Sequence, residues 1–298
     1  MFAQTQNELH NMKHMSILAV SLLALVACTP EKKQEADYSQ YVNPMIGTDF
    51  TGNTYPGAQL PFGMVQLSPD NGLPGWDRIS GYFYPDTTIA GFSHTHLSGT
   101  GAGDLYDISF MPVTRPYKEA PAPLGIYSTF SHNDEAASAG YYRVLLKDYN
   151  INVELTATER CGIQRYTFPE AEASVFLNLK KAMNWDFTLD SKIEVVDSTP
   201  IRGYRLSQGW SPLQHVYFET RFSKPFVACH MDTTSIVTKE KGWIGTAYVA
   251  RFDFNTKKDE EILVTTGISG VSMEGAGKNL RACFVVFPFS FCNVRIAL

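Results

Sequence analysis

The sequence predicts an all-β protein, an antiparallel β-sandwich of the supersandwich type with long Gly/Pro-rich loops. Three observations predict this fold. From residue 141 onward, apolar and polar residues alternate with a period of two, which is typical of strands with one buried face. Helical periodicity is weak, and polar or Gly/Pro-rich stretches separate most of the short runs. Aromatic residues, which strands favour, make up 13% of the chain.

The predicted strands follow one another through the second half of the chain. In the run that starts at Ile151, the apolar residues Val153, Leu155 and Ala157 continue one face, and polar residues occupy the other. One side of this strand is therefore expected to face a core. Further strands of this kind are expected at 142–146, 162–168, 174–179, 192–196, 202–206, 216–222, 248–254 and 261–266.

The first half of the globular part is organised differently. Residues 38–140 carry most of the prolines of the chain and many glycines, which favour long structured loops between a few strands. Residues 131–140 are interpreted as a turn or one short helical turn. We place the sandwich domain at 38–270, because residues 271–282 have the character of an entry to a helix or linker.

The N-terminus has the pattern of a secretory signal. An apolar segment at 17–27 follows Lys13, and it is too short to span a bilayer as a helix. The segment ends in Leu-Val-Ala-Cys, which resembles a bacterial lipoprotein cleavage box and makes Cys28 the predicted lipidated N-terminus. A cleaved signal with an incidental Cys28 is the alternative. We assign the signal peptide to 1–28, with an upstream extension at 1–11, and a polar tether to 29–37.

Composition excludes several classes of partner and site. A net charge of −5 argues against a nucleic-acid partner, which requires a basic face. An apolar fraction of 44% predicts a packed core and not a disordered chain. The spacing of Cys and His does not predict structural zinc. The sequence does not favour a Cys161–Cys229 disulfide over two buried thiols.

The C-terminal residues 283–298 are anomalous for such a domain. They are almost entirely apolar, they contain Pro288, and they are too short to span a membrane comfortably. If exposed, the segment would be an aggregation hazard. We interpret it as the product of a frameshifted or truncated reading frame, and an edge strand of the sandwich is the alternative.

The loop at 91–107 (GFSHTHLSGTGAGDLYD) carries the most informative residues of the chain. Its glycines weaken helices and regular strands, and they let the backbone approach a ligand closely. His94 and His96 alternate, so an extended backbone would place both on one side. Three interpretations compete: a metal site with Asp104, hydrogen bonds that brace the loop, or direct contact with substrate. We favour bracing.

Three blocks of sequence resemble a known family: 41–63 (YVNPMIGTDFTGNTYPGAQLPFG), 79–107, which includes FSHTHLSGTG, and 270–282 (GVSMEGAGKNLRA). They are similar to the N-terminal part of family 92 glycoside hydrolases, which are calcium-dependent exo-α-mannosidases. The resemblance implies a β-sandwich followed by an (α/α)6 barrel, with the active site at the interface. It also implies that the barrel supplies the Ca²⁺ ligands and the acid and base for inverting hydrolysis. Related proteins are often exported lipoproteins, so we expect a periplasmic or cell-surface lipoprotein of a Gram-negative bacterium.

The resemblance also assigns roles to individual residues. Phe50 matches a family position that presents an aromatic ring at the −1 sugar subsite, although it could instead cap the sandwich core. Gly99 is expected to approach sugar hydroxyls through its backbone, with Gly101 as the alternative. Trp76, in an exposed loop, is a candidate for stacking on a sugar face. Trp185 and Trp210 are weaker candidates, at the domain interface.

The two acidic residues of the 91–107 loop could be mistaken for a catalytic pair. Because the family draws its acid and base from the barrel, we interpret Asp104 and Asp107, like His94 and His96, as loop-bracing groups. The chain stops where the barrel should begin. We therefore expect no catalytic residue and no metal ligand in this chain.

Three functional hypotheses follow from these assignments. The first is the carbohydrate-binding, substrate-pocket domain of an inverting exo-α-mannosidase, inactive alone, whose partners are a mannose-containing glycan and the missing barrel. The alternative is a stand-alone surface glycan-binding lipoprotein. A metal-dependent enzyme that uses His94 and His96 is a third hypothesis. In each of the first two cases, the membrane is reached only through the lipid anchor at Cys28.

Overall fold

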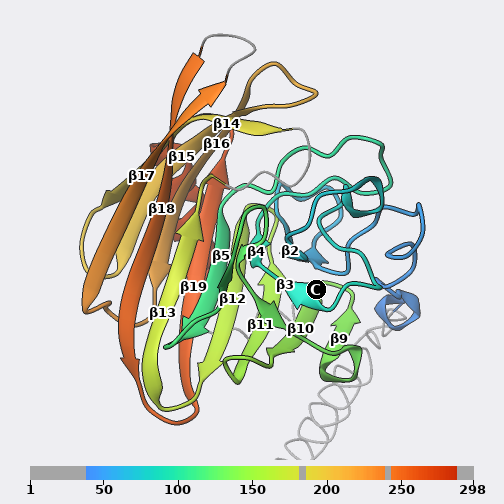
Figure 1. Cartoon of the computed structure of the whole chain (residues 1–298), viewed down its shortest axis with the longest axis horizontal. Helices are drawn as coiled ribbons and strands as arrows, with labels where there is room; N and C mark the ends of the chain where they lie inside the picture. The colour runs from blue at the N-terminus through green and yellow to red at the C-terminus, as the bar shows by residue number, and fades with distance from the viewer. Residues whose placement is uncertain (1–37, 181–185, 239–242, 287–298) are drawn as a thin grey trace, which may run out of the picture. The chain divides into compact units, whose positions relative to one another are not determined.

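The computed structural model describes residues 38–180, 186–238 and 243–286. Within the unit Ser39–Leu298, these residues build two antiparallel β-sheets that face each other (Figure 1). The predicted all-β sandwich is therefore confirmed. In the part of the chain that the structure describes, no helix is long and apolar enough to cross a membrane. The predicted signal peptide with Cys28, the tether and Trp185 lie outside the described residues.

The first sheet joins short strands of the loop-rich half to long strands of the second half. Antiparallel pairing of β5 with β13 makes this connection. The order across the sheet is β1 (Ala58–Gln59), β2 (Gln66–Asp70), β4 (Gly91–Ser93), β5 (Ser109–Thr114), β13 (Ala171–Asn178), β18 (Trp243–Thr256) and β17 (Ala228–Thr238).

The second sheet takes most of its strands from the second half of the chain. Its order is β14 (Phe187–Val195), β15 (Pro200–Gln208), β16 (Gln214–Phe222), β19 (Glu260–Ser269), β12 (Cys161–Phe168), β11 (Ile151–Ala157), β10 (Tyr141–Leu146) and β9 (Glu135–Ser138). Short elements complete the fold: the ribbons β3 (Thr88–Ile89) with β8 (Ser128–Thr129) and β6 (Glu119–Ala120) with β7 (Gly125–Ile126), and single 3-10 turns at Ser39–Tyr41, Trp76–Arg78 and His132–Asp134.

Phe222 of β16 lies in the core between the two sheets. Its ring centroid is 6.5 Å from that of Phe110 in β5, 5.2 Å from Phe252 and 5.5 Å from Phe254 in β18. These separations suit tilted and edge-to-face contacts, which add to the stabilisation from buried area. The alternation of residues in the sequence predicted one buried face for β16 and one for β18. These two faces therefore pack against each other between the sheets.

Two strands lie where the sequence predicted none. The strand β17 is rich in polar residues, which hides its alternation, and it is held by pairing with β18 along its whole length. The strand β9 occupies part of the stretch that we interpreted as a turn or helical turn. Gly140 has a φ of +67°, which allows the tight reversal from β9 into β10.

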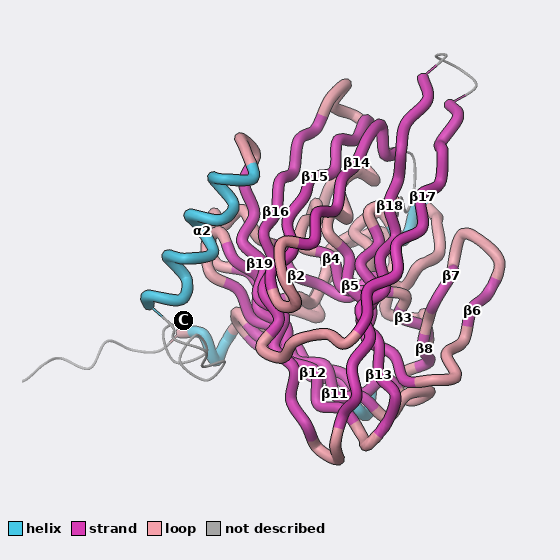
Figure 2. Tube along the Cα trace, turned by 90° about the vertical axis from the view of Figure 1, so that its left-hand side faces the viewer, coloured by secondary structure: helices cyan, strands magenta, loops and turns pink. Residues whose placement is uncertain are grey.

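A helix, α2 (Met273–Val286), packs on the outer face of the eight-stranded sheet against β16 and β19 (Figure 2). Gly267 of β19 permits this contact, because a Cβ there would lie 2.6 Å from the Ala276 carbonyl oxygen and 2.7 Å from the Leu280 nitrogen. The helix includes the buried Cys283, so it crosses the point where the sequence placed the start of the apolar tail. Residues 287–298 of that tail are not among the described residues.

Cys161 and Cys229 are both free thiols. Cys161 is buried in β12, whereas Cys229 is half-buried in β17 of the other sheet. The structure therefore has no disulfide between them.

The contact between α2 and β19 can be tested at its glycine. We expect Gly267→Ala to lower the free energy of unfolding by about 1–3 kcal/mol, because the new methyl meets helix backbone that cannot move aside alone. Gly270→Ala is the matched control, since the atom nearest to a Cβ there is the His215 carbonyl oxygen at 3.9 Å. Urea denaturation measures both variants. Equal stability of the two would contradict this packing.

Candidate functional site

The loops of the N-terminal half gather beside β2, β3 and β4 (Figure 1). The 91–107 loop begins as β4 and then leaves the sheet. Its imidazole and acidic side chains, His94, His96, Asp104 and Asp107, are each no more than 3% exposed. The titratable groups that the sequence singled out in this loop are therefore buried and do not face solvent.

His96 is held between a backbone carbonyl and a buried carboxylate. Its Nδ1 lies 2.7 Å from the Gln66 carbonyl oxygen, and its Nε2 lies 2.9 Å from Asp70 Oδ1. Nδ1 therefore donates to the Gln66 carbonyl oxygen, and Nε2 is hydrogen-bonded to the Asp70 carboxyl group. Ser93 Oγ lies 3.1 Å from His96 Nε2 and from Asp70 Oδ1. This network joins the loop to β2.

His94 has a different environment. Its Nδ1 donates to the Ile108 carbonyl oxygen at 2.7 Å, and its Nε2 is buried without a partner among the described residues. The ring packs against Gly162 of β12, where a Cβ would lie 2.5 Å from His94 Cδ2. Burial lowers the pKa of His94 to about 4, so the ring is neutral near pH 7. The two histidines therefore contact different elements.

Arg205 of β15 anchors the end of the loop. Its Nη1 donates to Asp107 Oδ1 at 2.7 Å, and its Nη2 donates to Asp186 Oδ2 at 2.8 Å. The remaining acceptor, Asp107 Oδ2, is 2.7 Å from the Thr95 hydroxyl, and Arg205 Nε donates to Thr188 Oγ1 at 2.9 Å. Arg205 and both carboxylates are buried, and burial raises the pKa of Asp186 to about 7 although Arg205 opposes that shift.

Sequence reasoning missed Arg205, yet a signal was present. In β15 the buried positions alternate through Ile201, Gly203, Arg205 and Ser207. A charged residue at one of the buried positions of a strand requires a buried partner of opposite charge. Here Asp107 and Asp186 are those partners.

Asp104 joins the loop to the turn between β15 and β16. Its Oδ2 accepts from the Trp210 backbone nitrogen at 2.6 Å and from Gln214 Nε2 at 2.8 Å. A cavity of about 570 Å³ lies at this junction, and its wall includes Gly101, Asp104 and Trp210. The Trp210 side chain is 83% exposed. The structure thus places an exposed ring beside the glycine-rich part of the loop.

The predicted sugar-binding residues lie around the same loop. The Gly99 nitrogen donates to the Asn53 carbonyl oxygen at 2.6 Å, which brings the loop against the turn that carries Phe50. Phe50 is 80% exposed, so it does not cap the core. Gly101 faces the ring of Trp76, because a Cβ there would lie 3.3 Å from Trp76 Cη2. Trp76 is itself mostly exposed.

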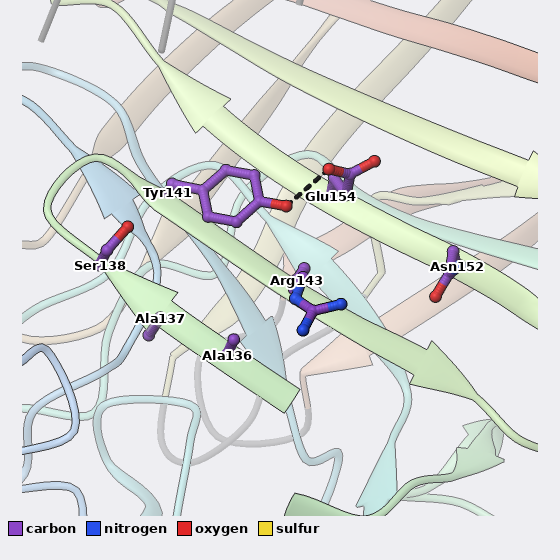
Figure 3. A pocket seen from close by; sticks show the side chains of 7 residues that line it. All are labelled: Ala136, Ala137, Ser138, Tyr141, Arg143, Asn152 and Glu154. Atoms are coloured by element: carbon purple, nitrogen blue, oxygen red, sulfur yellow. Dashed lines mark hydrogen bonds between the residues drawn. The ribbon is translucent and has the colours of Figure 1, made fainter. Parts of the chain in front are cut away.

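A second hollow, of about 480 Å³, lies on the outer face of the eight-stranded sheet across β9, β10 and β11 (Figure 3). Within it, the Tyr141 hydroxyl donates to Glu154 Oε1 at 2.5 Å, and Arg165 Nε donates to Glu154 Oε2 at 2.7 Å. Both oxygens of this carboxylate are therefore engaged. Ala136 and Ala137 provide small side chains on its rim.

The acidic residues at the loop do not suit a calcium ion. Calcium takes six to eight oxygen ligands, and carboxylates are the usual charged ones. One oxygen of each of Asp104, Asp107 and Asp186 instead accepts from an arginine, an amide or the backbone, and Asp104 Oδ1 and Asp186 Oδ1 are buried without a partner among the described residues. Across residues 38–180, 186–238 and 243–286, no group of three or more His, Cys, Asp or Glu side chains is placed to hold a metal ion.

The residues that build this fold match the profile of a known sequence family. The profile of the "Glycosyl hydrolase family 92 N-terminal domain" matches residues 41–269, which is most of the chain. The chain belongs to glycosyl hydrolase family 92. The matched region of this family 92 chain includes the whole 91–107 loop and ends with β19.

Solved family 92 structures have the same fold. An α-mannosidase from Bacteroides thetaiotaomicron, solved with mannoimidazole, matches with a TM-score of 0.78 and 37% identity, over 87% of this chain and 35% of that chain. The family 92 glycosyl hydrolase ccman5 matches with a TM-score of 0.72 and 26% identity, over 88% and 36%. The present family 92 chain therefore spans about a third of the length of these relatives.

A curated relative is known as an uncharacterized secreted glycosidase of Arthroderma benhamiae. It is 27% identical over 172 residues, which are 54% of this chain and 21% of that protein. The family 92 resemblance stated from the three sequence blocks is therefore confirmed by independent comparisons.

The neutral state of His94 predicts a pH dependence of stability. The pKa of His94 is below its unfolded value of about 6.5, so its contribution is complete above pH 6.5 and is lost as pH falls toward 4. Between pH 7.5 and pH 5 the protein should lose about 2 kcal/mol through this group. His94→Asn keeps a donor for the Ile108 carbonyl but cannot titrate, so this variant should lose correspondingly less. Denaturant unfolding at both pH values measures the difference, and identical losses would refute the assignment.

Proposed function

We propose that this domain forms the sandwich wall of a mannose-binding pocket, of the kind used by inverting exo-α-mannosidases that act on mannose-containing glycans. The observation that carries the proposal is the arrangement of Phe50, Trp76 and Trp210. Their side chains are exposed around a glycine-rich loop whose His and Asp side chains are buried and hydrogen-bonded. Binding sites combine apolar and aromatic walls with a few fixed polar groups, and this end of the sandwich offers both.

The glycines of the loop serve the same purpose. Gly99 has a φ of +66° and no heavy atom within 4 Å of a would-be Cβ, so its backbone is open on that side. A sugar hydroxyl could approach it without meeting a side chain. Gly101 lines the cavity beside Trp210. Both glycines therefore suit the backbone contact proposed for the terminal mannose.

We further propose that catalysis and calcium binding belong to a barrel domain outside this chain, as the family resemblance implies. A general acid or base must reach the proton it transfers. Asp104, Asp107 and Asp186 are buried and hold the loop through Gln214 and Arg205. Bracing of the loop, and not proton transfer, is the role we assign to them and to His94 and His96.

Calorimetry with methyl α-mannoside and α-mannobiose tests the pocket. We expect measurable binding that falls roughly tenfold, about 1.4 kcal/mol, in Phe50→Ala, Trp76→Ala or Trp210→Ala, because each change removes a ring face. Tyr217→Ala is the matched control, since Tyr217 lies on β16 and packs against Tyr204. No heat with any mannoside, or equal losses in the control, would count against the proposal. Calcium-dependent mannose release by this chain alone would refute the division of labour.

The exposed rings also support the second candidate, a stand-alone surface glycan-binding lipoprotein. The two candidates differ in the expected effect of a barrel domain that is added to the purified chain. Added to the purified chain, a separately produced family 92 barrel should restore mannose release if this is half of an enzyme. Unchanged glycan binding without any hydrolysis would favour the stand-alone protein.

We also propose export with a lipid anchor at Cys28. The secreted relative supports export, and the cleavage-box sequence supports lipidation of Cys28. Expressed in a Gram-negative host, the protein should partition with membranes and take up labelled palmitate, and Cys28→Ala should lose both properties. Label incorporation into the Cys28→Ala variant would rule out this anchor.

A further inference from the structure

Two cysteines meet where α2 packs on the sheet. Cys161 of β12 and Cys283 of α2 are both buried in one small cluster with Tyr141 and Ile163. Cys161 Sγ donates to the carbonyl oxygen of Asn279 at 3.2 Å. Asn279 lies one helical turn before Cys283, on the same face of the helix. The Cys283 side chain therefore stands next to Cys161.

We propose that Cys161 and Cys283 form a disulfide that fastens α2 to β12. The two thiols share one small buried cluster, and Cys161 also contacts the helix backbone one turn before Cys283. This placement suits a disulfide, which needs the two side chains to face each other at close range. The contact links distant parts of the chain, since Cys161 and Asn279 are 118 positions apart. Closing a loop of this size restricts the unfolded chain strongly, so the bond should stabilise the fold.

The oxidant we name is a small disulfide of the glutathione class. Cys283 is the more exposed of the two thiols, at 6% against 1% for Cys161, so an external disulfide meets it first and Cys283 is the attacking group. Its thiolate attacks one sulfur of the oxidant, the oxidant S–S bond breaks, and one thiol is released. Cys161 then attacks Cys283 Sγ, its proton passes to the second leaving thiolate, and the protein disulfide forms. Two protein thiols are oxidised, and one external disulfide is reduced to two thiols.

The pair lies close to the surface of the sheet. Tyr141 belongs to the thiol cluster and also lines the hollow across β9, β10 and β11 (Figure 3). Tyr141 therefore connects the thiol cluster to the wall of this hollow. Cys283 lies in the last part of α2, and helix ends open more readily than helix centres.

The test uses the full chain with Cys28→Ser, Cys229→Ser and Cys292→Ser, which leaves only the proposed pair. After incubation with glutathione disulfide, denaturation and alkylation, we expect a mass lower by two hydrogens, no alkylation and a Cys161–Cys283 peptide. The melting temperature should rise by several degrees and return when a reductant is added. Alkylation of both cysteines, or a lasting glutathione adduct, would overturn the proposal.

A matched control separates proximity from general reactivity. The variant Cys161→Ala with Cys229 restored keeps two cysteines, but the structure places Cys229 on the other sheet. We expect no disulfide in it under the same conditions, and its formation would overturn the proposal. Should the multiple variant fail to fold, peptide mapping of the unaltered chain after the same oxidation decides between a Cys161–Cys283 link and two free thiols.

Discussion

The buried contact of Arg205 with Asp107 and Asp186 is the interaction on which this end of the domain depends. An arginine without solvent needs charged partners in close geometry, and removal of one partner leaves an uncompensated charge. Asp107 comes from the loop, whereas Arg205 comes from a strand of the opposite sheet. The ion pair therefore fixes the position of the loop relative to the two sheets. A loop so rich in glycine would otherwise have many accessible conformations.

The other polar groups of the loop extend the same principle. His96 reaches β2, His94 reaches β12, and Asp104 reaches the β15–β16 turn. Each group contacts a different element, so the loop is fixed from several directions. What remains facing outward is mostly apolar or backbone. A polar sequence thus produces a surface on which aromatic rings and open glycine backbone are the prominent features.

Strands could be predicted from the sequence where apolar and polar residues alternate strongly. The alternation in Ile151–Ala157 identified β11 and its buried face, because one side of that strand meets a core. It failed for β17, whose polar side chains obscure the pattern. The family was identifiable because FSHTHLSGTG is long and unusual. The partners of its side chains were not, since the bond between Asp104 and the Trp210 nitrogen joins residues 106 positions apart. Trp210 therefore remained a weak candidate until the fold placed it beside the loop.

The strand β16 touches two regions that have been described separately. At its first residue, Gln214 donates to Asp104 of the loop. Farther along, the Glu219 carboxylate lies against Gly277 of α2. The strand β16 thus connects the part of the loop beside Trp210 to the helix α2. The contacts of β16 with both regions therefore tie the position of α2 to that of the glycine-rich loop.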